Sequence, residues 1–275
     1  MPIIPRYNLI TVFLATFGLA ALFIGGVPNS VNAALIAHYS FDTSVTSDDS
    51  GNGYNLNTGN GGPSQVTGQF GNAADFNGSS FLYLNGPTQN SAFNIGTGNF
   101  AMSFWYQSDG SAFSPFVGKN SSSLDQGYAA SLAGSVFGDL GDTTGGFVTT
   151  ARPTDDGSVF HHLVFQSMGG QLQLFLDGVL ASTAAGSGSD AVSSAFAIGT
   201  RNISQAGAQN FNGTSQKLDG RIDEVWVFDN ALTTTEISNL NSYNSLAAPV
   251  PEPGTLAILG LGLAGLGFAR RKRAG

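Results

Sequence analysis

With 275 residues and no cysteine, the chain is long enough for one large domain and must hold its fold without disulfide bonds. Its net charge is −8, and the part between the termini is more acidic, at −12, because five of the ten basic residues lie in the termini. Such an acidic domain is a poor partner for nucleic acid and for anionic membrane surfaces.

The N-terminus predicts export. One charge, Arg6, precedes an uncharged apolar stretch from Leu9 to Gly26, and Val31-Asn32-Ala33 supplies the small residues that a signal peptidase reads. We therefore predict a helical signal peptide over residues 1–33, which signal peptidase cuts after Ala33. An uncleaved N-terminal anchor is the alternative, because the apolar stretch is long for a signal peptide.

Short apolar or alternating runs then recur between clusters of Gly, Asn, Asp and Ser, the pattern of a β-sandwich or barrel. The predicted strands are Ile36–Phe41, Ala73–Phe76, Phe81–Tyr83, Ala101–Gln107, Phe113–Gly118, Tyr128–Leu132, Gly146–Thr150, His161–Gly169, Gln171–Leu176, Val179–Thr183, Ala195–Ile198 and Gly220–Val227. Asp177-Gly178 and Gly169-Gly170 predict tight hairpin turns. One helix is predicted, capped by Thr233 with Glu236 three residues later. These signals predict one all-β domain over residues 34–246.

The C-terminal segment, residues 247–275, has three unlike parts. Three prolines between Pro249 and Pro253 force an extended spacer, and an uncharged apolar run follows from Gly254 to Ala269. Four cations, Arg270, Arg271, Lys272 and Arg273, come next and would stop the run on the cytoplasmic side of the inner membrane. A helix over the apolar run would be about 24 Å long, short of the roughly 30 Å hydrocarbon core. The segment predicts a short transmembrane helix suited to a transient anchor.

This order of parts resembles the PEP-CTERM sorting signal of bacteria that build an exopolysaccharide matrix. The resemblance covers Val250–Arg273, with Pro251, Glu252 and Pro253 as the sorting motif. It implies recognition by a membrane-embedded exosortase, cleavage near that motif, and delivery to the cell surface or extracellular matrix. An ordinary C-terminal anchor is the alternative.

Five segments in the middle of the chain resemble, in the family's order, a concanavalin A-like, laminin-G-type jelly roll. They are LIAHYSFD with DDSGNGYNLNTGN, GQFGNAADFNGSSFLYL, NFAMSFWYQ, FHHLVFQSMGGQLQLFLDGVLAST and LDGRIDEVWVFDNALTTTEISNL. The resemblance spans about Ala34–Ser245. It implies a two-sheet antiparallel jelly-roll sandwich and, by analogy with family members, binding of carbohydrate.

One loop, Asp48–Gly53, gathers two carboxylates and an amide on a glycine-rich turn, which is the oxygen-ligand chemistry that calcium needs. Proteins with this jelly roll often hold calcium between this loop and the closing strand. The resemblance therefore points to Asp49, Asn52 and Asp223 as calcium ligands, with Asp48 as a substitute. A plain Asx turn with solvated charges is the open alternative.

Catalysis is not predicted. Glycoside hydrolysis needs two carboxylates that flank the scissile bond, and the Glu-x-Asp-x-x-Glu run of laminarinase-like relatives is missing from the chain. Asp223 and Glu224 are adjacent on a strand, as are His161 and His162, so the members of each pair should face opposite sides of their sheet. A structural role is therefore predicted for both histidines.

The sequence as a whole predicts an exported, non-catalytic surface or matrix protein that binds carbohydrate. A structural or adhesive matrix protein without a specific ligand is the alternative, and a relative of glycoside hydrolases is a distant third. Trp105 and Trp226 are predicted to lie in the core. The loop aromatics Tyr54, Tyr128 and Phe211 are better candidates for contact with a ligand.

Overall fold

The computed structural model describes residues 33–247, except 109–112, 121–125, 142–145, 187, 189, 192, 202 and 208–215. Contacts divide the chain into two units, Met1–Val31 and Asn32–Gly275, and every described residue belongs to the second unit. The predicted signal helix and the apolar C-terminal run lie outside the described residues. Neither helix within the described ranges has the length and apolar character that crossing a membrane requires.

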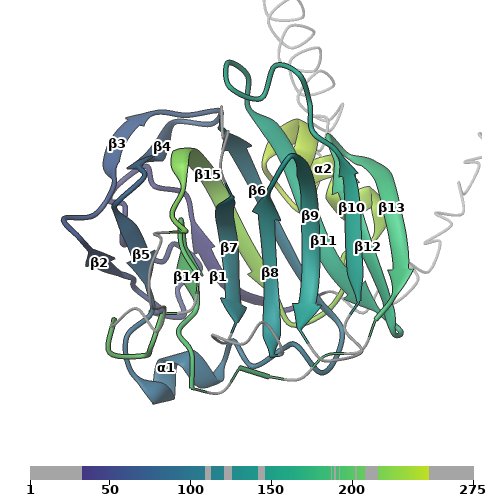
Figure 1. Ribbon diagram of the computed structural model, residues 1–275, viewed down its shortest axis with the longest axis horizontal. Coiled ribbons are helices and arrows are strands. Elements are labelled where there is room, and N and C mark those ends of the chain that lie inside the picture. The colour runs from purple at the N-terminus through teal and green to yellow at the C-terminus, as the bar shows by residue number, and fades with distance from the viewer. Residues whose placement is uncertain are drawn as a thin grey trace, which may run out of the picture. The chain divides into compact units, whose positions relative to one another are not determined.

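The described residues form two antiparallel sheets that pack face to face (Figure 1). The order in sheet A is β13 (Val179–Ala185), β12 (Gln171–Leu176), β11 (His161–Met168), β6 (Phe100–Gln107), β15 (Asp219–Phe228), β4 (Asn72–Asn77) and β3 (Ser64–Thr67), with β1 (Leu35–Tyr39) also paired to β15. The order in sheet B is β10 (Phe147–Ala151), β9 (Ser135–Gly141), β8 (Gly127–Leu132), β7 (Ser114–Asn120), β14 (Ala197–Ile198), β5 (Phe81–Tyr83) and β2 (Asn57–Gly59). The predicted all-β jelly-roll sandwich is confirmed.

Each predicted strand is present, with ends that differ by at most two residues. Both predicted hairpin turns are present as well, since Asp177 and Gly178 have φ of 51° and 78°, and Gly169 and Gly170 have φ of 59° and 78°. Two consecutive positive φ angles are the conformation that a two-residue hairpin turn requires. Strands β2, β3 and β9 and the short helix α1 (Pro87–Ser91) are the elements that the sequence analysis missed.

The core lies between the two sheets and is largely aromatic. Phe104 of sheet A meets Phe116 of sheet B with ring centroids 5.7 Å apart, and Phe100 meets Tyr128 at 5.0 Å. All four rings are fully buried or nearly so. Alternation along each strand sends every second side chain into this core and leaves the intervening ones on the outer faces of the sandwich. The outer faces are therefore where a ligand can be met.

The helix α2 (Thr234–Tyr243) covers part of the outer face of sheet A. Its N-terminus is the predicted capping box, in which Thr233 Oγ1 accepts from the Glu236 amide and Glu236 Oε2 accepts from the Thr233 amide. Ile237 and Leu240 of α2 pack in a second apolar cluster that includes Ala33 at the start of the domain. The strands and helices that the structure describes all lie within residues 33–247.

Candidate functional site

The predicted calcium loop is held together by its own carboxylates. Asp48 accepts from the backbone amides of His38, Ser50 and Tyr54 at 2.8–3.1 Å. Burial alone would raise the pKa of Asp48, but the hydrogen bonds from Ser50, His38 and Tyr54 outweigh it and lower that pKa. The carboxylate therefore stays charged while it shapes the turn.

Asp49 and Asn52 fasten the same loop to β1. Asp49 Oδ2 accepts from the Ser40 amide at 3.2 Å and from Ser40 Oγ at 2.6 Å. Asn52 Nδ2 donates to the carbonyls of Leu35 and Ile36 at 3.0 and 2.9 Å. These contacts are those of an Asx-type loop, the alternative that the sequence left open. Asp48 and Asp49 use carboxylate oxygens that a calcium ion would need, whereas Asn52 uses its amide nitrogen.

Asp223, the fourth predicted ligand, lies on β15 beside a different turn. Its Oδ2 accepts from the amides of Gln69 and Phe70 at 2.8 and 2.9 Å, whereas its buried Oδ1 has no partner among the described residues. A Cβ at Gly68 would come within 2.4 Å of this carboxylate, so glycine is required there. Burial is the main reason that the pKa of Asp223 rises to about 8; the Phe70 amide opposes it and the charge of Glu224 adds to it.

Asp42 is an acidic residue near this turn that the sequence analysis missed. Its Oδ1 accepts from the Asn72 amide at 2.7 Å, and a Cβ at Gly71 would almost touch that oxygen. Asp42 and Asp223 therefore contact the same turn, residues 68–72, from two sides. Across the part of the chain that the structure describes, no three acidic or histidine side chains converge as a metal-binding group. The unpartnered Oδ1 of Asp223 is the atom that fits a hard cation best.

The alternation predicted for Asp223 and Glu224 is wrong, because β15 carries a bulge between Asp223 and Trp226. Asp223 pairs with Trp105 on β6, and Glu224, at φ 53°, is the extra residue. Glu224 Oε2 lies 2.6 Å from His38 Nε2, and the His38 ring stacks on Trp226 at 3.6 Å. Both carboxylates thus reach the outer face of sheet A, and both are buried.

The two adjacent histidines have the structural roles that were predicted. His161 lies between the carboxylates of Asp177 and Asp155, at 2.9 and 3.2 Å from its two ring nitrogens. His162 is 1% exposed and bonds Ser103 Oγ at 2.7 Å. Burial lowers the pKa of His162 to about 4, so the ring is neutral at physiological pH.

Two of the loop aromatics do not present free rings, and the third is outside the described residues. Tyr128 is 1% exposed and donates to the Phe93 carbonyl inside the core, so its prediction as a ligand contact is wrong. Tyr54 is half-buried with its ring against Phe93. Phe211 lies in the range 208–215, which is not described.

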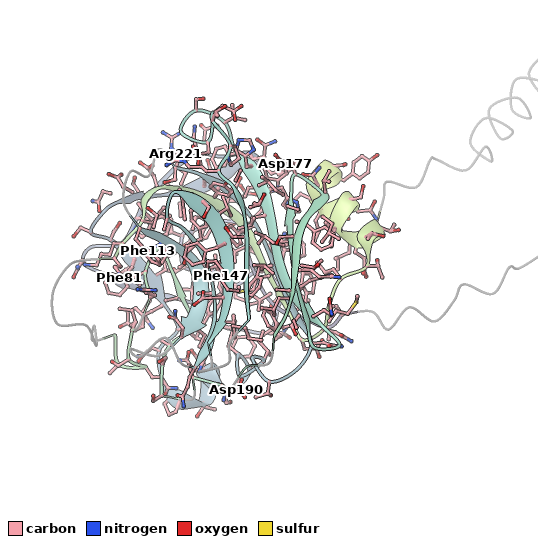
Figure 2. All side chains as sticks on the ribbon, turned by 45° about the vertical axis from the view of Figure 1, so that its right-hand side comes forward. Phe81, Phe113, Phe147, Asp177, Asp190 and Arg221 are labelled. Atoms are coloured by element: carbon pink, nitrogen blue, oxygen red, sulfur yellow. The ribbon has the colours of Figure 1, made fainter. Side chains whose placement is uncertain are left out.

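A row of phenylalanines crosses the outer face of sheet B instead. Phe137 of β9 meets Phe113, just before β7, at 5.7 Å and Phe147 of β10 at 5.0 Å between ring centroids. Phe137 is 8% exposed and Phe147 is 52% exposed, so the middle ring of the row is sheltered and the Phe147 end is open. Figure 2 labels Phe113 and Phe147 beside the strands of this sheet. We call Phe113, Phe137 and Phe147 the aromatic row.

Polar groups flank the aromatic row. The Arg201 guanidinium carbon lies 4.2 Å from the centre of the Phe113 ring, a cation–π contact. Asp139 stands opposite Phe147 in the strand register, and its Oδ1, like Ser131 Oγ, is buried without a partner among the described residues. Burial raises the pKa of Asp139 to about 6, although Arg201 lowers it part of the way. An aromatic surface with unsatisfied polar atoms beside it is the usual makeup of a sugar-binding site.

The two antiparallel sheets, the bulged closing strand and the capped helix define a concanavalin A-like jelly roll. The sequence profile of the concanavalin A-like lectin/glucanases superfamily, in its laminin-G form, matches residues 76–238. The chain belongs to this superfamily. A second profile, the PEP-CTERM protein-sorting motif, matches residues 249–273 and implies export with exosortase-mediated sorting of a membrane-anchored precursor.

Solved structures share the fold at low sequence identity. Domain 4 of AbnA, a GH43 extracellular arabinanase from Geobacillus stearothermophilus solved with arabinotriose, is 20% identical with a TM-score of 0.60, covering 76% of this chain and 99% of that one. The binding domain of Paraclostridial Mosquitocidal Protein 1 is 16% identical at a TM-score of 0.60, covering 76% and 52%. The binding domain of Botulinum Neurotoxin DC with SialylT is 11% identical at 0.54, covering 79% and 53%. The chain thus spans about half of each toxin domain. Comparison with curated protein sequences finds no match.

Proposed function

We propose that the domain is a non-catalytic carbohydrate-binding module of the cell surface or extracellular matrix, and that the aromatic row is its contact surface. The observation that carries the proposal is the open Phe147 ring at the end of a continuous row, with Asp139 and Arg201 beside it. Sugar rings stack their C–H faces on aromatic rings while their hydroxyls bond planar polar side chains. Similar folds solved with arabinotriose and SialylT support this ligand class by analogy.

Acid–base chemistry has little support on this face. Asp139 is the one acidic residue among the described residues of β7, β8, β9 and β10. Glycoside hydrolysis needs a second carboxyl group about 5–9 Å away. A single buried carboxyl beside an aromatic row can orient a hydroxyl but cannot serve as both acid and base.

The charge of the domain favours a neutral glycan. Five basic residues face seventeen acidic ones, so an anionic polysaccharide would be repelled at low salt. Delivery through the PEP-CTERM tail would place the domain at the cell surface or in the extracellular matrix, where it can meet neutral glycans. A structural matrix protein with no specific ligand is the competing function, and it does not require the exposed Phe147 ring.

The first prediction concerns Phe147. Replacing Phe147 by Ala should weaken retention of the domain by a neutral polysaccharide about tenfold, because stacking on this ring would bury apolar surface that contributes about 1–2 kcal/mol. Affinity gel electrophoresis of residues 33–247 in gels with arabinan, xylan or glucan measures the retention. Leu180→Ala, an apolar truncation at a side chain 47% exposed on sheet A, is the matched control.

Equal retention of Phe147→Ala and Leu180→Ala would remove the aromatic row as the site. Failure of every polysaccharide to retard the unaltered domain would favour the structural matrix protein.

Calcium is a second proposal, with Asp223 as the ligand best suited to it and Asp49, Asn52 and Asp48 as the ligands implied by the family. The ion would tie β15 to the turns around it and relieve the unpartnered Oδ1 of Asp223. A thermal melt of the domain with EDTA and then with excess calcium tests this. At about a thousandfold excess over Kd, a bound ion should stabilise the fold by about 4 kcal/mol and raise the midpoint.

Asp223→Ala should abolish the calcium-dependent rise of the midpoint. Asp49→Ala tests whether the ion is bound by the predicted loop or only beside the turn at residues 68–72. A midpoint that does not change with calcium in the unaltered domain would overturn the metal proposal and leave the glycan proposal untouched.

A further inference from the structure

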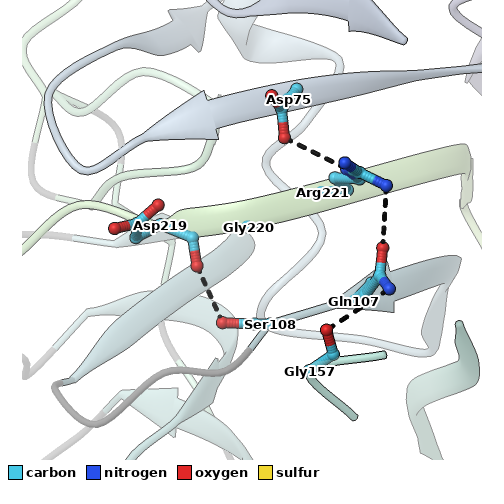
Figure 3. Close-up of a pocket in the computed structure, with 7 residues that line it drawn as sticks. All are labelled: Asp75, Gln107, Ser108, Gly157, Asp219, Gly220 and Arg221. Atoms are coloured by element: carbon cyan, nitrogen blue, oxygen red, sulfur yellow. Dashed lines mark hydrogen bonds and ion pairs between the residues drawn. The ribbon is translucent and has the colours of Figure 1, made fainter. Parts of the chain in front are cut away.

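A polar cavity lies on the outer face of sheet A, away from the aromatic row. It has a volume of about 200 Å³ and is lined by Asp75, Gln107, Ser108, Gly157, Asp219, Gly220 and Arg221 (Figure 3). A cavity of this volume has room for several water molecules and is on the scale of one sugar unit.

Three adjacent strands present one row of polar side chains along this cavity. In the register, Arg221 of β15 stands opposite Asp75 of β4 on one side and opposite Gln107 of β6 on the other. Arg221 Nε donates to Asp75 Oδ1 at 3.2 Å, and Arg221 Nη1 donates to Gln107 Oε1 at 3.2 Å. Figure 3 shows the guanidinium between these two partners. Strand backbones and paired side chains therefore fix the direction of the guanidinium before any ligand arrives.

Beside this row, the cavity is lined by backbone of β15 and of the Gly157 turn. Gly220 has φ 145°, and a Cβ there would lie 2.5 Å from the Gln107 carbonyl, so glycine lets β15 approach β6 closely. Ser108 Oγ donates to the Asp219 carbonyl at 2.9 Å, and Gln107 Nε2 donates to the Gly157 carbonyl at 3.4 Å. Among the described residues, the exposed Asp219 carboxylate and the Arg221 Nη2 group have no hydrogen-bond partner, so these two charged groups are the ones that can meet a ligand.

The charges of the cavity select the ligand. A guanidinium in its lining disfavours a metal ion, and two carboxylates beside one guanidinium disfavour an anion. A carboxylate only accepts and a guanidinium only donates, so the pair is complementary to two neighbouring hydroxyls, each of which does both. The matching chemical group is the vicinal diol of a neutral sugar.

We propose that this cavity binds one terminal or branch unit of a neutral glycan, through Asp219 and Arg221, as a second site separate from the aromatic row. The inference shares its ligand class with the proposed function and rests on it to that extent. A cavity of this volume takes a single sugar unit, so the site would bind the end or a branch of a glycan. The aromatic row would instead contact several units along the glycan.

The test uses residues 33–247, free monosaccharides as probes, and nuclear magnetic resonance of the labelled arginine side chains. Glucose, galactose, mannose, arabinose and N-acetylglucosamine are titrated at millimolar concentration. At least one should shift the Arg221 Nε–H signal in a saturable way. Asp219→Asn should weaken that binding about tenfold or more, because it leaves a desolvated hydroxyl without its charged partner.

Asp155→Asn removes the same charge from an exposed aspartate outside the cavity and should leave the titration unchanged. The proposal is overturned if no monosaccharide shifts Arg221, or if Asp219→Asn titrates like the unaltered domain. Polysaccharide retention separates this result from the proposed function. If retention depends on Phe147 and no monosaccharide binds, the cavity proposal is overturned and the proposed function stands. If retention is lost in Asp219→Asn but kept in Phe147→Ala, the aromatic row is overturned as the contact surface and the cavity proposal is supported.

Discussion

Replacing Asp139 by Asn is expected to stabilise the domain at neutral pH while weakening its retention by a glycan. Burial raises the pKa of Asp139 from 3.8 to about 6, with Arg201 lowering it part of the way. An acid whose pKa rises on folding favours the folded state only while it keeps its proton. That contribution is lost as the pH rises from about 3.8 through about 6. At pH 7 the ionised carboxylate therefore costs about 3 kcal/mol, a cost that Asn does not carry.

Urea unfolding at pH 4 and pH 7 measures the effect. The Asn variant should exceed the unaltered domain by about 2–3 kcal/mol at pH 7 and match it more closely at pH 4. For the unfolding measurement alone, Asp219→Asn, the same change at an exposed aspartate, is the control. Parallel stabilities at the two pH values would contradict the prediction. Stabilisation joined to weaker glycan retention would mean that the carboxylate is kept for binding at the expense of stability.

Lys119 should produce the second large effect. It should make the stability of the domain rise with pH, whereas Asp139 makes it fall. Its side chain is 1% exposed, and its Nζ donates to Asn94 Oδ1 at 2.9 Å and to the Ala191 carbonyl at 2.6 Å. Burial lowers the pKa of Lys119 from 10.5 to about 8, although the charge of Asp190 opposes the shift. The protonated amine is thus disfavoured in the folded state. This destabilisation is fully present below about pH 8 and disappears as the pH rises towards 10.5.

The stability of the unaltered domain should therefore gain about 2 kcal/mol between pH 7.5 and pH 10 relative to Lys119→Met. The variant loses the amine, while the tyrosines that also titrate at high pH are common to both proteins. Denaturant unfolding at the two pH values gives the difference directly. Two pH profiles that run in parallel would show that Lys119 does not titrate in this window.

Hairpins and caps were predictable from the sequence because their signals are local. Asp177-Gly178 fixes its turn through two positive φ angles, and Thr233 with Glu236 completes its capping box within four residues. Strand β9 was missed because Gly138 interrupts its apolar pattern. That glycine faces the core, where a Cβ would lie 2.3 Å from the Phe165 ring. Glycine is therefore needed at this position because of a contact with another strand, which the local sequence does not show.

The candidate site was less predictable for the same physical reason. Phe113, Phe137 and Phe147 are far apart along the chain and meet only through the register of sheet B. Asp139 belongs to the missed strand β9. The bulge that turns Glu224 towards His38 also has no local signal, because adjacent residues on a regular strand alternate. Side chains that act together across strands can be predicted only when the pairing of those strands is known.

Both ends of the described domain leave from one place. Ala33, where the signal peptide would be cut, and Leu246, just before the sorting tail, pack in the same apolar cluster beneath α2 on the outer face of sheet A. The aromatic row lies on the outer face of sheet B, on the opposite side of the sandwich. The sorting tail and the exported N-terminus therefore both join the domain on the side of sheet A, opposite the face of sheet B that carries the aromatic row.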